Sequence, residues 1–353
     1  MKEVGIIGSG IYLPERKIGN LELEEILGLA SGFIETRTGI KERRWSNKQE
    51  TVEYMASQSA INAVKDAGVN KVDRLILARD LIATRRAYSI GLKVIQELEK
   101  SGIDVSECTS LDICNYCPGF VNGLNIAQLM VGSGQSENSL VVASTDYTDM
   151  ININKDFNAQ FRESFDPENN YIVQYSLGEN GRFQPPALNA FLWGCGAGAI
   201  VVGETDGNNI LGFKTRGSKK LKFDSYGIGE SKDGKSFGSL DGKAIYRYAQ
   251  TEVPTFIDDF LEDLGLTHEG ISILIPHQPN PRILRDLSKR LQIPEEKVLV
   301  SCDYLGNMIA ASVPITYHLA RENGKIKTND KIMMCSFGDS YLTASGIVFN
   351  ENR

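Results

Sequence analysis

The sequence predicts an α/β protein built from two similar halves. Short runs rich in valine, isoleucine and leucine alternate with segments of helical periodicity, which is typical of sheets covered by helices on both faces. These strand–helix units recur on both sides of about residue 205, and no linker rich in proline, glycine or serine divides the chain. We therefore predict an N-terminal half at residues 1–205 and a C-terminal half at residues 206–353, packed face to face.

The individual elements follow from the same patterns. Apolar runs of four or five residues predict strands at 4–7, 74–77, 139–143, 199–202, 271–275, 297–300 and 331–334. Helical periodicity predicts helices at 51–68, 90–101, 121–131, 245–266, 281–291 and 310–323. Gly324 follows the last of these, where a helix usually stops. The polar, asparagine-rich segment at about 150–186 breaks the alternation and is expected to be an insertion that forms a lid or a partner-binding loop.

The charge balance argues against a nucleic-acid-binding protein. The net charge is −7, whereas phosphate binding requires a basic excess over a whole face. Two local basic clusters, at 37–44 and 282–290, could be no more than solvated faces.

The cysteines favour a reducing compartment. Six cysteines are scattered through the chain, and Cys114 and Cys117 form a C-x-x-C without a second Cys or His pair that would complete a zinc site. We expect no metal site and no disulfide. No signal-like region and no apolar stretch long enough to span a bilayer is seen, so a cytoplasmic location is expected.

The N-terminal glycines do not predict a dinucleotide site. Gly5, Gly8 and Gly10 lie on or after the first strand, but Leu13 occupies the third glycine position of G-x-G-x-x-G, and Pro14 ends any helical pattern. We interpret these glycines as a strand and turn.

Cys117 is the first candidate for covalent chemistry. It lies where a strand ends and a helix at about 121–131 begins, so we predict Cys117 at the N-cap and Pro118 at the first helical position. The helix dipole and free N–H groups there stabilise a thiolate. The competing interpretation is a small buried apolar residue.

His277 and Asn307 are candidate partners for this thiolate. Of the three histidines, His268 lies in a polar connection and His318 on a helix, whereas His277 directly follows a strand and Pro276. Strand ends of α/β sheets collect ligand sites, and Asn307 follows the next expected strand. The order Cys, His, Asn also occurs in papain-like proteases, but that family carries its cysteine near the N-terminus in a different motif.

At these residues the sequence resembles the β-ketoacyl-acyl carrier protein synthase III family of thiolase-fold condensing enzymes, nearly from end to end. Six blocks carry the resemblance: Arg37-Thr-Gly-Ile-Lys-Glu-Arg-Arg44, Glu50-Thr with Met55-Ala56, Cys117-Pro-Gly-Phe120, Gly194-Cys-Gly-Ala-Gly-Ala199, His277-Gln-Pro-Asn280-Pro-Arg282, and Gly306-Asn307 with Ala310-Ala-Ser-Val-Pro314. The resemblance implies a duplicated βαβαβαββ core in five layers, αβαβα, and a homodimer.

The resemblance also implies an acyltransferase and assigns roles. Cys117 would accept an acyl group from acyl-CoA or acyl-ACP. His277 and Asn307 would then stabilise the enolate formed when a malonyl or β-ketoacyl thioester enters a decarboxylative Claisen condensation. Coenzyme A or phosphopantetheine thioesters are implied as substrates, with no permanently bound cofactor. Arg37, Phe33, Asn280 and Arg282 would contact them, and Arg282, with Arg285 and Lys289, would dock an acidic carrier protein.

Several departures from the family indicate a specialised member. Phe33 replaces a usual tryptophan, Cys195 replaces an aspartate, and Asp339 stands where a glycine-rich turn supplies an oxyanion donor. Tyr88 matches a residue that gates the neighbouring subunit's acyl channel. Alternatives therefore stay open: acyl transfer to an oxygen or nitrogen nucleophile, head-to-head condensation of two acyl chains as in dialkylresorcinol- or quinolone-type secondary metabolism, or a non-catalytic partner subunit.

Overall fold

The computed structural model describes most of the chain. The described residues are 3–27, 29–79, 90–146, 148, 191–206, 209–218, 226–230, 236–240, 242–338 and 343–351, with four two-residue strands between 165 and 184. Tyr88, Asp339 and nearly all of the expected insertion at 150–186 lie outside the described residues.

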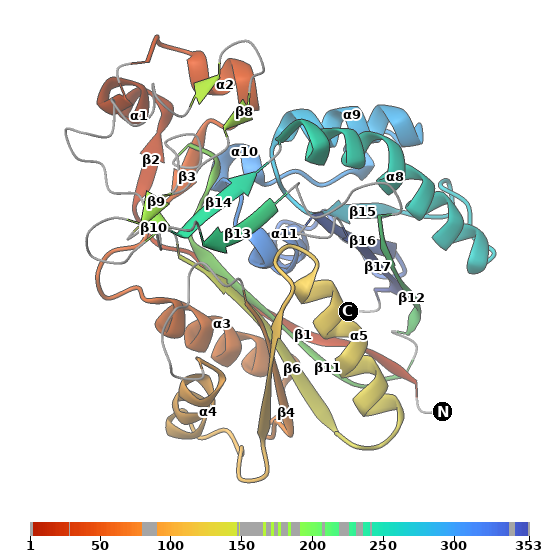
Figure 1. Cartoon of the computed structure of the whole chain (residues 1–353). Helices are drawn as coiled ribbons and strands as arrows, with labels where there is room; N and C mark the ends of the chain where they lie inside the picture. Colours follow the sequence, from red (N-terminus) through yellow and green to blue (C-terminus); the bar gives the residue numbers. More distant parts are fainter. Residues whose placement is uncertain are drawn as a thin grey trace.

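Two sheets form the centre of the molecule (Figure 1). The first has the order β1-β11-β6-β4-β5 and comprises β1 (Val4–Tyr12), β11 (Gly196–Glu204), β6 (Asn138–Thr145), β4 (Arg74–Arg79) and β5 (Thr109–Cys114). The second has the order β12-β17-β16-β15 and comprises β12 (Ile210–Gly217), β17 (Thr343–Asn350), β16 (Lys331–Gly338) and β15 (Ile273–Pro276). Strand β4 runs parallel to β5 and β6, and β15 runs parallel to β16, so the carboxyl ends of these neighbours lie at common edges.

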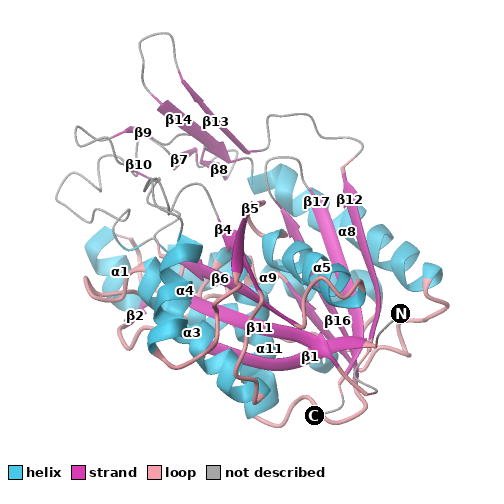
Figure 2. Cartoon of the chain, turned by 90° about the horizontal axis from the view of Figure 1, so that it is seen from below, coloured by secondary structure: helices cyan, strands magenta, loops and turns pink. Residues whose placement is uncertain are grey.

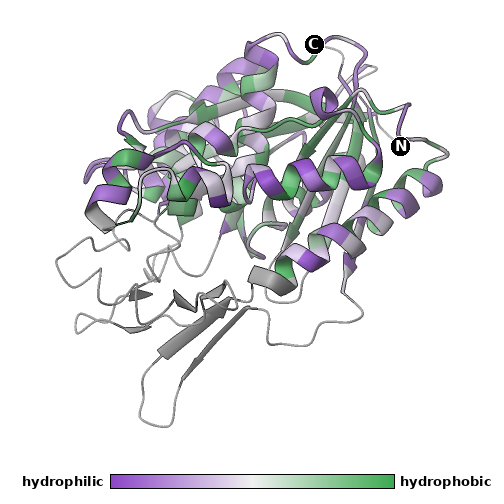
Figure 3. Ribbon diagram, turned by 90° about the horizontal axis from the view of Figure 1, so that it is seen from above, coloured by the Kyte–Doolittle hydropathy of each residue, from purple (hydrophilic) through white to green (hydrophobic). Residues whose placement is uncertain are grey.

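Helices separate and cover the sheets in five layers (Figures 1 and 2). The helices are α3 (Val52–Ala67) and α4 (Ile90–Lys100) outside the first sheet, α5 (Gly119–Gly132) and α11 (Ser312–Glu322) between the sheets, and α8 (Gly242–Asp263) and α9 (Pro281–Leu291) outside the second sheet. The predicted five-layered, thiolase-like α/β architecture is confirmed. Apolar residues concentrate in the strands, while the covering helices alternate polar and apolar residues (Figure 3).

Smaller elements complete the fold. They are β2 (Lys17–Gly19), α1 (Asn20–Leu27), α2 (Phe33–Thr38), β3 (Glu42–Arg44), β7 (Phe165–Asp166), β8 (Tyr171–Ile172), β9 (Ser176–Leu177), β10 (Phe183–Gln184), β13 (Tyr226–Glu230), β14 (Ser236–Leu240), η2 (Glu295–Lys297), α10 (Cys302–Leu305) and η3 (Ile309–Ala311). The chain has no helix, within the part that the structure describes, that is both long and apolar enough to cross a membrane.

The layer between the two sheets is the largest apolar cluster. Helix α5 contributes Phe120 and Leu124, and α11 contributes Tyr317, all fully buried. Gly198 of β11 lies so close to α11 that a Cβ atom would approach Pro314 to 2.8 Å. Burying apolar side chains on both faces of each central helix stabilises the association of the two sheets.

The strand prediction at 297–300 is wrong. Pro294 precedes the short 3-10 helix η2, and of the expected strand Val298 forms only an isolated bridge with Leu274. Elsewhere the strands of the first sheet all precede residue 205 and those of the second all follow it. We propose that 1–205 and 206–353 are the two halves of the molecule.

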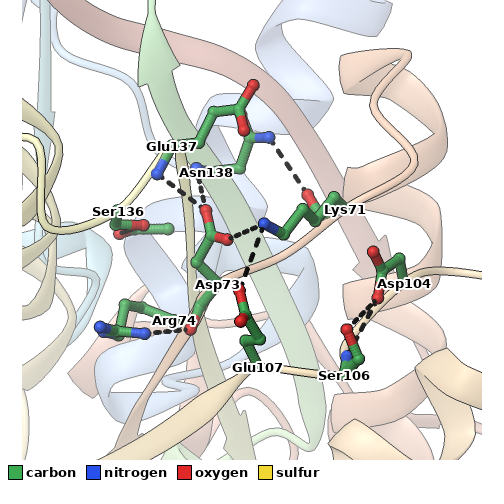
Figure 4. Close-up of polar contacts among 10 residues, drawn as sticks. Lys71, Asp73, Arg74, Asp104, Ser106, Glu107, Ser136, Glu137 and Asn138 are labelled. Atoms are coloured by element: carbon green, nitrogen blue, oxygen red, sulfur yellow. Dashed lines mark hydrogen bonds and ion pairs between the residues drawn. The ribbon is translucent and has the colours of Figure 1, made fainter.

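Asp73 joins the starts of the neighbouring strands β4 and β6 of the first sheet (Figure 4). Its carboxylate accepts hydrogen bonds from the backbone N–H groups of Glu137, at 2.7 Å, and Asn138, at 2.9 Å, and pairs with Lys71 at 3.0 Å. Burial raises the pKa of Asp73, but the two N–H groups and Lys71 together outweigh burial, so the net pKa lies below its usual value.

Replacing Asp73 with asparagine should therefore lower the free energy of unfolding at pH 7 by about 1–3 kcal/mol, because charge-assisted hydrogen bonds are lost. Since the folded-state pKa of Asp73 is depressed, its stabilisation is complete above the unfolded-state pKa and is lost as the pH falls through the folded-state pKa. Urea unfolding of both proteins at pH 7 and at about pH 3 should show the difference shrinking in acid. Glu107→Gln is the matched control, because Glu107 also faces Lys71 but its side chain is 80% exposed. A difference that is unchanged in acid would contradict this role for the Asp73 charge.

Candidate active site

Cys117 lies in a tight turn between the edge strand β5 and the central helix α5. The helix begins at Gly119 and Pro118 is its N-cap, so the prediction of Cys117 at the N-cap is wrong by one residue. Pro118 already has helical dihedral angles without being counted in the helix, and Cys117 precedes it. Tyr116, directly before Cys117, has a φ of 45°, an uncommon value for a residue with a side chain. The strained turn presents Cys117 at the N-terminal end of a buried helix.

The end of β16 lies against Cys117. The hydroxyl of Ser336 donates a hydrogen bond of 2.6 Å to the Cys117 carbonyl, which ties the turn to the second sheet. Gly338 has a φ of 132°, and a Cβ atom on it would lie 3.3 Å from the Cys117 Sγ. A side chain at position 338 would therefore strain the backbone and crowd the space beside the sulfur.

His277 is buried at the carboxyl end of β15. This strand pairs with β16, whose end lies against Cys117. Its backbone N–H donates to the Cys335 carbonyl at 2.7 Å, and its ring meets the Phe337 ring edge-on at 5.8 Å between centroids. Burial lowers the pKa of His277 to about 3, although a hydrogen bond to the Ile309 backbone acts in the opposite direction. The imidazole is therefore neutral at physiological pH. Its Nδ1 atom is buried and has no hydrogen-bond partner among the described residues.

Asn307 is held in a defined orientation by its neighbours. Its side-chain Oδ1 accepts a 2.8 Å hydrogen bond from the N–H of Ile309, the same residue whose backbone contacts His277. Because the atom that accepts from an N–H must be oxygen, the amide nitrogen of Asn307 is left as a donor. Ile309 has a φ of 49°, and a β-branched residue in that region costs roughly 1–3 kcal/mol. The strained Ile309 thus links His277 and Asn307, the two candidate hydrogen-bond donors.

These contacts connect the three residues predicted from sequence. Cys117 touches the end of β16, His277 packs against Phe337 of the same strand, and the backbone of Ile309 bonds both His277 and Asn307. Cys117, which is partly buried, thus lies against the same strand as the neutral imidazole, and Ile309 links that imidazole to the oriented amide of Asn307. This arrangement suits nucleophilic catalysis with hydrogen-bond donors for a developing negative charge.

Three other cysteines differ from Cys117 in their surroundings. Burial raises the pKa of the Cys108 thiol to about 11 and that of Cys335 to about 12, and it raises the pKa of Cys302 well above its usual value. Thiols held protonated in this way are poor nucleophiles. Cys195, the departure from the family's aspartate, is buried and its Sγ lies 3.3 Å from the Asp146 Oδ1.

The predicted ligand-binding residues gather around α2 and the start of α9. The Arg37 guanidinium lies over the Phe33 ring, 4.7 Å from its centroid. Arg282 donates a 3.0 Å hydrogen bond to the Arg37 carbonyl and so joins the two helices. Asn280 is the N-cap of α9, because its Oδ1 accepts from the Ile283 N–H at 3.0 Å. This capping role leaves the amide nitrogen of Asn280 available for a ligand.

A cavity of about 680 Å³ lies between α2 and α9. It is lined by Glu35, Thr36, Gly39, Lys41, Pro281, Arg282, Leu284, Arg285, Ser288, Glu295, Val298, Val300 and Asp303. Cys117, His277 and Asn307 are not among these residues, so this cavity is bordered by basic residues such as Lys41, Arg282 and Arg285 and does not include the Cys117 sulfur.

Sequence patterns did not indicate the residues that support this site. Gln278 is fully buried: its amide nitrogen donates to the carbonyls of Pro276 and Leu299, and its Oε1 accepts from the Ser301 N–H. It thereby fastens the segment after His277 to the segment before Asn307. The one sequence feature that could have indicated Gln278 is its position directly after His277, because a single buried glutamine produces no periodic pattern.

Comparisons with known proteins identify relatives that share this fold. Two family models match, the 3-oxoacyl-[acyl-carrier-protein] synthase III model at residues 111–162 and its C-terminal counterpart at residues 261–349. The β-ketoacyl-[acyl-carrier-protein] synthase III of Aquifex aeolicus is 32% identical over 336 residues, which cover 94% of this chain and 95% of the relative.

Solved structures show the same similarity. The crystal structure of 3-oxoacyl-[acyl-carrier-protein] synthase III from Aquifex aeolicus superposes with a TM-score of 0.79 at 30% identity and covers 98% of this chain and 99% of the other. The priming β-ketosynthase of the R1128 polyketide pathway gives 0.81 at 26% identity and covers 99% and 97% of the two chains.

The fold and the relatives define an acyltransferase of the thiolase-fold class of condensing enzymes. Within that class, the chain belongs to the β-ketoacyl-acyl carrier protein synthase III family.

Proposed function

We propose that this protein transfers an acyl group from acyl-CoA or acyl-ACP to Cys117 and then condenses it with a malonyl or β-ketoacyl thioester. The observation that carries the proposal is the position of Cys117. Its sulfur lies against Gly338, and the same strand contacts the ring of a neutral, buried His277. Such a set of groups serves acyl transfer followed by charge stabilisation rather than proton transfer alone.

In the first half-reaction the Cys117 thiolate attacks the thioester carbonyl of the donor. The carbon–sulfur bond of the donor breaks, and its thiolate leaves while the acyl group stays on Cys117. The backbone N–H of Cys117 lies at the N-terminal end of α5 and would donate to the oxyanion of the tetrahedral intermediate. Gly338 leaves room for that oxygen because it has no side chain.

In the second half-reaction a malonyl thioester loses carbon dioxide. The electrons of the broken carbon–carbon bond move into an enolate, whose oxygen would accept hydrogen bonds from His277 and the Asn307 amide. The Asn307 amide supplies N–H donors, and the neutral His277 ring supplies one when its single ring proton lies on the nitrogen that faces the enolate rather than on the nitrogen that faces Ile309. The carbanion then attacks the acyl carbonyl, and the Cys117 thiolate leaves from the β-ketoacyl product.

The basic surface around α9 supports thioester carriers as partners. Arg282, Arg285 and Lys289 are exposed along α9 at helical spacing, and Arg37 is exposed beside them. A phosphopantetheine phosphate or an acidic carrier protein would be attracted to these cations even though the whole chain is negatively charged. The stacked Phe33 offers a flat apolar surface for a nucleotide base. No permanently bound cofactor is part of this proposal, and a cytoplasmic location stays a prediction.

The edge strand β5 supports a homodimer. Within the described residues β5 pairs only with β4, and five of its six residues are exposed, including Leu111 at 43%. An exposed strand edge with an apolar side chain is a template for pairing with a second copy. A monomer by sedimentation at micromolar concentration would refute this arrangement.

The proposal is tested by exposing the protein to a panel of acyl-CoA and acyl-carrier thioesters, followed by intact-mass measurement, and by following carbon dioxide release from a malonyl thioester. One acyl donor should add its acyl mass at Cys117, and the malonyl thioester should release carbon dioxide and give a β-ketoacyl product. The added mass would also identify the length of the acyl chain. The departures from the family at positions 33 and 195 lead us to expect a specialised acyl donor.

Each alternative gives a different outcome. An acyl adduct that is passed to an amine or alcohol without carbon dioxide release would indicate transfer to a heteroatom. Condensation of two long acyl thioesters would indicate a head-to-head reaction. Absence of any acyl adduct would indicate a non-catalytic subunit and would overturn the proposal.

A further inference from the structure

Arg43 is an arginine that is completely buried. It lies in β3, its exposed fraction is 0%, and it is among the largest fully buried side chains of the described residues. Burial lowers the pKa of Arg43 to about 10, although Glu24 and Glu42 act in the opposite direction. The guanidinium is therefore charged at neutral pH. Burying a charged side chain is unfavourable unless hydrogen bonds or opposite charges compensate for the hydration that it loses.

Its hydrogen bonds join segments that are far apart in sequence. One nitrogen, Nη1, donates to the Ile18 carbonyl at 3.1 Å and to the Asn20 side-chain oxygen at 2.8 Å. The other, Nη2, donates to the Phe191 carbonyl at 2.7 Å. Arg43 thus anchors the chain at Phe191, just before β11, to the layer formed by β2 and β3.

The segment that follows Phe191 holds the backbone of Asn307. The Asn307 N–H donates to the Leu192 carbonyl at 2.7 Å, and the Asn307 carbonyl accepts from the Gly194 N–H at 3.0 Å. These two bonds form an isolated parallel β-bridge between Asn307 and Trp193. The position of residues 192–194 therefore sets the position of the Asn307 amide.

Arg43 also packs directly against the residue before Asn307. Gly306 has a φ of 74°, and a Cβ atom on it would lie 2.9 Å from the Arg43 Cβ and 3.0 Å from the Gly194 N. The N–H of Lys41, directly before the strand of Arg43, donates a 2.7 Å hydrogen bond to the carbonyl of Asp303 in helix α10, which ends at Leu305. Arg43 therefore contacts the Asn307 segment both through Phe191 and through Gly306.

We propose that Arg43 is a positioning residue that fixes Asn307 for stabilisation of the enolate. In this proposal Arg43 does not touch the substrate. It acts by holding the backbone at Phe191 and at Gly306, the two segments that set the position of Asn307. This inference rests on the proposed function. A shift of about 1 Å in a catalytic group can lower a rate by about a hundredfold, so loss of this anchor should be visible in one half-reaction.

The test separates the two half-reactions. Acyl transfer is followed as the rate of adduct formation on Cys117, and the second half as carbon dioxide release from a malonyl thioester. Arg43→Met keeps the volume but removes all three hydrogen bonds, and should lower decarboxylation by about 10- to 100-fold while acyl transfer stays within about threefold. Arg43→Lys, which retains the charge, should lie between Arg43→Met and the unaltered protein.

A second measurement asks whether the effect passes through Asn307. In the Asn307→Ala background, Arg43→Lys should change decarboxylation by less than about twofold, because residues that act through one group are not additive. Arg321→Met is the matched control. Arg321 is also largely buried, but its hydrogen bonds go to Ser9 and Asp66 rather than to the Phe191 segment. Its loss should affect both half-reactions equally.

The outcomes are distinct. A parallel fall of both half-reactions in the Arg43 variants, or an undiminished effect of Arg43→Lys without Asn307, would overturn the positioning role. Failure of the unaltered protein to decarboxylate a malonyl thioester would instead overturn the proposed function on which this role depends.

Discussion

Replacing Cys117 with alanine is expected to abolish the acyl adduct and to lower condensation by roughly 10⁴- to 10⁶-fold, the scale on which enzymes lose activity when a covalent nucleophile is removed. The adduct cannot form because no other described cysteine combines exposure with a place at the start of the central helix. Cys108, Cys302 and Cys335 have thiol pKa values raised by burial. Intact-mass measurement after incubation with the acyl donor checks this directly.

The same variant should keep its decarboxylase activity within about tenfold, since His277 and Asn307 remain in place and supply the electrostatic stabilisation. Cys114→Ala is the matched control, because Cys114 is an exposed cysteine three residues earlier, at the end of β5. It should form the adduct at an unchanged rate. An undiminished adduct on the Cys117→Ala protein would refute the assignment of the nucleophile.

Replacing His277 or Asn307 with alanine is expected to have the reciprocal effect. Each change should lower carbon dioxide release from a malonyl thioester by about 10²- to 10³-fold, the cost of removing one donor from an oxyanion site. The rate of acyl adduct formation on Cys117 should change much less, because the proposed mechanism gives neither side chain a part in the attack of the Cys117 sulfur on the acyl donor. Equal losses in both half-reactions would contradict the division of labour.

The pH dependence of activity provides a separate check on His277. Its pKa of about 3 means that the folded protein holds the imidazole neutral throughout the range from pH 5 to pH 8. No loss of decarboxylation from titration of this histidine is therefore expected in that range. An acidic limb with a midpoint near the usual histidine pKa, present in the unaltered protein and absent in His277→Gln, would show that the ring works as an acid or base instead.

Stability should respond to pH through the same residue. The unfolded chain binds a proton to His277 near its ordinary pKa, whereas the folded chain binds it only near pH 3. Between these values the unfolded state holds more protons, so this group makes the protein less stable as the pH falls. The His277→Gln variant, compared by urea unfolding between pH 7 and pH 4, should lose less stability in acid than the unaltered protein.

The sequence by itself determined the fold class, the family and the three candidate reacting residues. The alternation of apolar runs with helical segments is local and periodic, and it correctly predicted the central strands and helices, including β6, β11, α3 and α9. Cys117, His277 and Asn307 were found because each stands beside a strand end within a distinctive short motif. It failed at residues 297–300, where Pro294 and a 3-10 turn replace an apolar strand.

Only the tertiary structure decided how these residues are held together. The chain starts α5 one residue later than its capping pattern indicated, because the strained Tyr116 and the Pro118 N-cap belong to the turn rather than to the helix. Arg43 reads in sequence as part of a basic cluster, yet it is fully buried and bonded to the carbonyl of Phe191, 148 residues away. The neutral state of His277 likewise depends on its burial at the end of β15, where its ring packs against Phe337. Short-range patterns determine elements, whereas burial, electrostatics and contacts between distant segments arise only when the two sheets close around the central helices.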